Sequence, residues 1–120
     1  MAEPSFVEHN GKRLLLLDYS GLTPPEIIAY MQEAKRVIAA EPHQSVRLLS
    51  LVTRIQVTND VVTALEEFAT HNAPFVLASA IVGATSFQKA AIALSITSMG
   101  RLNVETFDDE EEAKDWLAAR

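Results

Sequence analysis

Residues 46–82, VRLLSLVTRIQVTNDVVTALEEFATHNAPFVLASAIV, hold two apolar runs with a helix-like segment between them. The runs at 46–52 and 75–82 contain almost no polar residues, which is typical of strands buried on both faces. Thr58, Asn59 or Asp60 can cap a helix in the intervening segment. The apolar side of that helix consists of Val61, Leu65, Phe68 and Ala69. This pattern predicts two parallel strands joined by a right-handed crossover.

The segment before this unit carries a hairpin signal and a helix start. Asn10-Gly11 suits a two-residue type I′ turn, because both residues tolerate positive φ. Residues 6–9 and 14–17 flank the turn as strands, and the second is an all-leucine run. Thr23 and Glu26 have the spacing of a capping box. The helix that follows has an apolar face of Ile27, Met31, Ala34 and Ile38, and Pro42 helps to end it.

The segment after residue 82 predicts two more helices and one strand. Residues 83–85 turn into a third helix from about Ser86 to Met99, with Gly100 as its C-terminal cap. Residues 102–107 form a short strand, and Asp108 or Asp109 caps a last helix. The inward face of that helix is Ala113, Trp116 and Leu117. The predicted fold class is a single α/β domain over residues 1–120, of order ββαβαβαβα, with a mostly parallel sheet and an N-terminal hairpin.

Composition and charge exclude several functions. The chain has no cysteine, which excludes disulfides and thiolate metal sites and fits a cytoplasmic protein. We expect no secretory signal, because no basic segment leads into an apolar run at the start. Residues 75–99 carry Lys89 as their only charge, but polar breaks favour a buried strand, a turn and a helix over a membrane span. The net charge is −6 without a basic stripe, so nucleic-acid binding is disfavoured.

The whole pattern resembles the SpoIIAA-like, or STAS-like, proteins. The resemblance rests on the Asn-Gly hairpin, the buried strand ending in an acid, the successive βα units and the turn at 82–85. It also rests on the helix ending at Gly100-Arg101 and on the closing Phe107, acid run, Ala113 and Trp116-Leu117. It implies a βα superhelix that regulates partners or binds small apolar or lipid-like ligands. Relatives that antagonise anti-sigma factors carry an Asp-Ser-Ser-Gly phosphoacceptor motif at the second helix, whereas residues 53–60 here offer only Thr53 and Thr58 as hydroxyls.

Candidate site residues gather at the predicted carboxyl ends of the strands, where open α/β sheets bind ligands. Asp18 and Ser20 follow one strand, and they are either a ligand site or an Asp/Ser turn. Thr85, Ser86 and Lys89 open the third helix as an anion site, or as a cap with an extended lysine. With Thr53 and Thr58 they would bound one pocket. The three histidines lack metal-ligand spacing, so we expect neither a metal nor another cofactor.

The third predicted helix is apolar almost all round. A helix on one face of a sheet should keep a polar outer stripe. Its outer face is therefore covered by a second subunit, by a protein partner, by a ligand or by the domain's own last helix. We expect a non-catalytic regulatory or ligand-binding module that acts through protein contact, as a homodimer for example, or through a small apolar or anionic ligand. The alternative is a small enzyme with Asp18 as acid/base and an anion held by Thr85 and Lys89.

Overall fold

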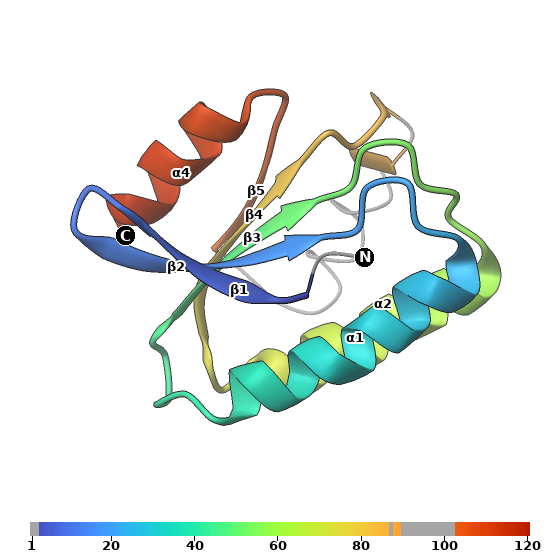
Figure 1. Ribbon diagram of the computed structural model, residues 1–120, viewed down its shortest axis with the longest axis horizontal. Coiled ribbons are helices and arrows are strands. Elements are labelled where there is room, and N and C mark those ends of the chain that lie inside the picture. The colour runs from blue at the N-terminus through green and yellow to red at the C-terminus, as the bar shows by residue number, and fades with distance from the viewer. Residues whose placement is uncertain (1–2, 87, 90–102) are drawn as a thin grey trace.

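A five-stranded sheet forms the centre of the computed structural model, which describes residues 3–86, 88, 89 and 103–120 (Figure 1). The strands lie in sequence order: β1 (Ser5–His9), β2 (Lys12–Asp18), β3 (Val46–Leu51), β4 (Val76–Val82) and β5 (Val104–Phe107). β1 pairs with β2 antiparallel, and every other pair is parallel. The α/β class and the mostly parallel sheet with an N-terminal hairpin are therefore confirmed.

The Asn-Gly turn connects β1 and β2 as predicted. Asn10 has φ 51° and Gly11 has φ 76°, which are the positive values that a type I′ turn requires. The turn fixes the register of the hairpin, in which Val7 pairs with Leu14. Leu14, Leu15 and Leu17 are fully buried, so the leucine run contributes to both faces of the sheet.

Helices α1 (Pro24–Ala39) and α2 (Asn59–Asn72) lie side by side on one face of the sheet (Figure 1). Thr23 and Glu26 form the complete capping box, and Thr58 caps α2. The predicted apolar face of α1 is buried throughout, and so are Val61 and Phe68 of α2. Leu65 differs from this pattern, because 38% of its surface is exposed.

Helix α4 (Glu110–Ala118) covers the opposite face of the sheet (Figure 1). Asp109 caps it, while Ala113 and Leu117 are fully buried. The strand residues beneath α4 include Ala78 and Ala80, and small side chains there let the helix approach closely. Just past the C-terminal end of α4, the side chain of Arg47 in β3 donates a hydrogen bond to the carbonyl of Arg120 at 2.8 Å.

The two faces of the sheet form two separate cores. Leu15, Leu17, Tyr19 and Leu48 belong to the core beneath α1 and α2. Leu14, Leu49, Ala78, Ala80 and Val82 belong to the core beneath α4. Because successive strand residues point to opposite faces, Ser50 and Ser79 lie on the α1/α2 side.

The third predicted helix lies mostly outside the described residues. Ser86, Gln88 and Lys89 have helical backbone, whereas Met99 and its Gly100 cap are not described. In the described part of the chain, no helix is long and apolar enough to cross a membrane.

Candidate functional site

Three loops meet at the carboxyl edge of the parallel strands. The amide of Tyr19 donates to Leu51 at 2.9 Å, and the amide of Gly21 donates to Thr53 at 3.1 Å. The amide of Val52 donates to Val82 at 2.9 Å. These bonds continue the sheet pairing past the strand ends. They bring the segments 18–21, 53–58 and 83–86 to one edge of the sheet, as the strand order predicts.

Thr53 and Gly83 are in direct contact within this edge. Gly83 has φ +91°, and a Cβ built there would collide with Thr53 Oγ1. The absence of a side chain at Gly83 is therefore what lets the two loops approach. The Thr53 hydroxyl fills the space beside the glycine.

Asp18 and Ser20 form a local turn. Asp18 Oδ1 accepts from the backbone amide of Ser20 at 3.0 Å. The amide of Asp18 itself donates to the Tyr30 hydroxyl at 3.1 Å. This is the Asp/Ser turn geometry that the sequence left open beside a ligand site. The carboxylate of Asp18 thus orders the loop from β2 into α1.

The residues of the predicted anion site make contacts within the chain. Thr85 and Gln88 form a reciprocal cap, with the Thr85 amide donating to Gln88 Oε1 at 2.9 Å and the Gln88 amide donating to Thr85 Oγ1 at 3.2 Å. Lys89 Nζ forms an ion pair with Asp108 Oδ1 at 2.7 Å. Ser86 is exposed. The cation that was expected to bind an anion therefore binds a carboxylate of the loop after β5.

Thr58 has a capping role as well. Its Oγ1 accepts from the amide of Val61 at 3.3 Å. Val57, the residue before the cap, and Val62, four positions into the helix, have the spacing of a hydrophobic staple. Val57, Val62 and Leu65 are the large apolar side chains that the described residues expose.

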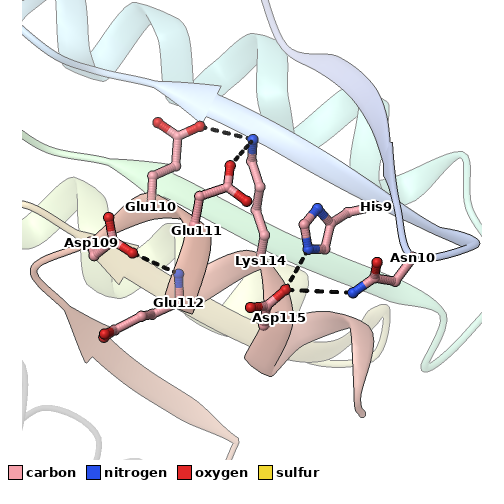
Figure 2. Close-up of polar contacts among 8 residues, drawn as sticks. All are labelled: His9, Asn10, Asp109, Glu110, Glu111, Glu112, Lys114 and Asp115. Atoms are coloured by element: carbon pink, nitrogen blue, oxygen red, sulfur yellow. Dashed lines mark hydrogen bonds and ion pairs between the residues drawn. The ribbon is translucent and has the colours of Figure 1, made fainter.

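The histidines lie apart, and each contacts a neighbour. His9 Nε2 lies 2.6 Å from Asp115 Oδ1, which also accepts a hydrogen bond from Asn10 at 3.4 Å (Figure 2). The cluster ties the hairpin turn to α4. The His43 ring packs edge-on against Phe75, and His71 contacts Asn72. Among the described residues, no three His, Cys, Asp or Glu side chains could hold a metal ion together.

Three buried hydroxyl groups were not identified from the sequence. Tyr19, Ser50 and Ser79 are 4%, 8% and 7% exposed. The Tyr19 hydroxyl has no hydrogen-bond partner among the described residues. Burial, reinforced by the nearby Tyr30, raises the pKa of Tyr19 well above its ordinary value, so its hydroxyl stays protonated and able to donate. A serine inside each of two mainly apolar strands was the available sequence signal.

The comparisons with known proteins agree with this architecture. A family model described as SpoIIAA-like matches residues 7–118, which is nearly the whole chain. No curated protein and no solved structure matches the chain. With the sheet order and the caps at the predicted positions, the match establishes that the chain belongs to the SpoIIAA-like family.

Proposed function

We propose that this chain is a non-catalytic regulatory module that acts by binding a protein partner or a small, mainly apolar ligand. Members of the SpoIIAA-like family are commonly regulatory protein-interaction modules and are generally non-catalytic. The observation that carries the proposal is the use of the candidate catalytic groups in structural contacts. Asp18 orders a turn, and Lys89 is paired with Asp108.

The alternative, a small enzyme, requires Asp18 as an acid/base beside an anion bound by Thr85 and Lys89. A general base must reach the proton that it abstracts, and an anion site needs a cation that is free to bind. Thr85 is engaged in a cap, and Lys89 in an ion pair. These contacts favour the binding module over the enzyme.

The partner surface that the sequence favours is the apolar segment 86–99, through which the chain would form a homodimer or bind another protein. Large exposed apolar patches are unusual in monomers. The exposed Val57, Val62 and Leu65 of α2 provide further apolar surface. Both features support binding by surface contact.

Native mass spectrometry of the protein purified gently from its native host tests the proposal. A binding module is expected to appear as a dimer, as a complex with a partner, or with a retained small molecule. The reference mass is that of the bare chain, 13.2 kDa. A bare monomer under all growth conditions would contradict both the dimer and the tightly bound ligand.

A further inference from the structure

Strand β1 lies at the edge of the sheet, and its outer side pairs with no strand in the described part of the chain (Figure 1). His9 and Lys12 flank the two-residue turn, so they exchange both of their backbone hydrogen bonds. Bonded positions alternate along an antiparallel pair, so Val7 also bonds to β2. The amides and carbonyls of Phe6 and Glu8 therefore point outward, away from β2.

These outward backbone groups are open to a further strand. Among the described residues, neither the Phe6 amide nor the Glu8 amide donates a hydrogen bond. Of the described elements, β2 and α4 make the main contacts with β1. The polar contact with α4 is at the turn end of β1, where His9 binds Asp115. An exposed strand edge of this kind is a template for pairing with another chain.

The side chains along this edge carry complementary charges. The guanidinium carbon of Arg13, in β2, lies 3.5 Å from the centre of the Phe6 ring. Its Nη1 binds Glu41 at 2.7 Å, while 61% of the Arg13 side chain remains exposed. Glu8 is exposed on the same face of the sheet and forms no ion pair among the described residues. The edge thus presents a cation held above Phe6 and, two residues further along the strand, an anion without a counter-ion there.

A second copy of this edge fits one antiparallel register better than its neighbours. With Val7 on the two-fold axis, Phe6 of each copy lies opposite Glu8 of the other, and each such pair exchanges both backbone hydrogen bonds. A register centred on Phe6 would set Glu8 against Pro4, which has no N–H to donate. A register centred on Glu8 would set two carboxylates against each other. In the Val7 register, Glu8 instead meets the ring above which the Arg13 guanidinium of the other copy lies.

We propose that β1 pairs antiparallel with β1 of a second copy of this chain, so that the two sheets become one continuous sheet across a two-fold axis. Glu8 of each copy forms an ion pair with Arg13 of the other. The interface goes beyond the proposed function, because it uses the sheet edge rather than segment 86–99. One short strand buries little area, so the dimer is weak and depends on concentration.

Amide hydrogen exchange of the full chain, measured by NMR at a series of protein concentrations, tests the pairing. The amides of Phe6 and Glu8 point out of the monomer and should exchange fast in dilute solution. Their exchange should slow at least about fivefold between about 50 µM and about 2 mM, as the dimer forms. The Val7 amide already bonds to β2, so its exchange should change less, and it serves as the internal control.

Complementary charge variants, compared by sedimentation velocity, test the ion pair. Glu8→Arg and Arg13→Glu each set like charges together at both symmetric contacts, so each variant alone should dimerise at least about tenfold more weakly. In an equimolar mixture of the two variants, both contacts again join opposite charges, and the dimer should return. Mixing cannot restore an effect that arises within one chain. Glu66→Arg makes the same charge change at an exposed position of α2 and should leave association unchanged.

Several outcomes would overturn the proposal. Exchange of Phe6 and Glu8 that does not depend on concentration would do so, and so would a mixture that associates no better than the separate variants. A dimer that Glu8→Arg leaves intact, or that Glu66→Arg weakens equally, would be held by another surface. Protection that appears only in extract of the native host would mean that the edge takes a strand of another protein. If circular dichroism shows that Arg13→Glu does not fold, exchange in the wild-type chain decides the question alone.

Discussion

Thr53 Oγ1 lies where a side chain at Gly83 would have to go. The contact joins the loop after β3 to the end of β4 at the carboxyl edge of the sheet. It explains why a glycine with φ +91° stands at this position. Any side chain there would have to separate the two loops.

Gly83→Ala should therefore lower the free energy of unfolding by about 2–5 kcal/mol, the sum of the costs of a left-handed alanine and of a steric overlap. Gly11→Ala is the matched control, since Gly11 has φ +76° but nothing within 4 Å of the added Cβ. It should cost only about 1–2 kcal/mol. Urea unfolding measures both.

The double variant Thr53→Ala/Gly83→Ala separates overlap from backbone strain. Removing Oγ1 should recover part of the loss, so that the two changes are not additive. Equal costs for Gly83→Ala and Gly11→Ala would contradict the role of the contact.

Asp18 allows a test of the structural role against the catalytic one. Asp18→Asn keeps an oxygen that can accept from the Ser20 amide, so stability should change by less than about 0.5 kcal/mol. Asp18→Ala loses the acceptor and should cost about 1 kcal/mol. Binding of the retained partner or ligand should survive Asp18→Asn. If Asp18→Asn abolished a reaction of the protein while leaving its stability unchanged, Asp18 would be a catalytic group.

Local signals in the sequence predicted much of the fold. The hairpin, the Thr23 cap and the apolar face of α1 each depend on residues a few positions apart. The caps of α2 and α4 were narrowed to residues 58–60 and 108–109, and the structure has them at Thr58 and Asp109. Such spacing fixes backbone geometry within one element.

Contacts between elements were not predictable in this way. Lys89 pairs with Asp108, nineteen positions away, only because β5 lies beside β4. The position of Ser50 relative to Ser79 on one face of the sheet depends on the register of β3 and β4, which the pattern of a single strand does not contain. The exposure of Leu65 likewise depends on what packs beside α2, although its spacing matches the buried Val61 and Phe68.

Leucine-to-alanine substitutions at Leu117 and Leu65 compare the helical layers on the two faces of the sheet. Leu117 of α4 is fully buried, so Leu117→Ala should cost about 2–5 kcal/mol through lost burial and a cavity. Leu65→Ala removes the same atoms from a partly exposed position and should cost less than about 1 kcal/mol. Thermal or urea unfolding measures the difference. A large loss for Leu65→Ala would show that the exposed side of α2 is covered in solution.

The buried phenols predict the response of the protein to alkaline pH. Burial raises the pKa of Tyr19 well above its ordinary value, and it also raises the pKa of Tyr30, against a smaller opposing effect of the hydrogen bond from the Asp18 amide. Above about pH 10, the unfolded chain loses tyrosine protons that the folded protein keeps. Unfolding therefore becomes easier as pH rises, by at most about 1.4 kcal/mol per pH unit for each such group. Below that pH, both states are protonated, and these groups add no pH dependence.

Tyr19→Phe isolates the contribution of Tyr19, because every other titrating group is retained. Urea unfolding from pH 8 to 11 should show a shallower loss of stability in the variant, with the two curves diverging only above about pH 10. Equal slopes in the variant and the wild type would mean that the Tyr19 phenol ionises as readily in the folded protein as in the unfolded chain. That outcome would contradict its burial in the layer beneath α1 and α2.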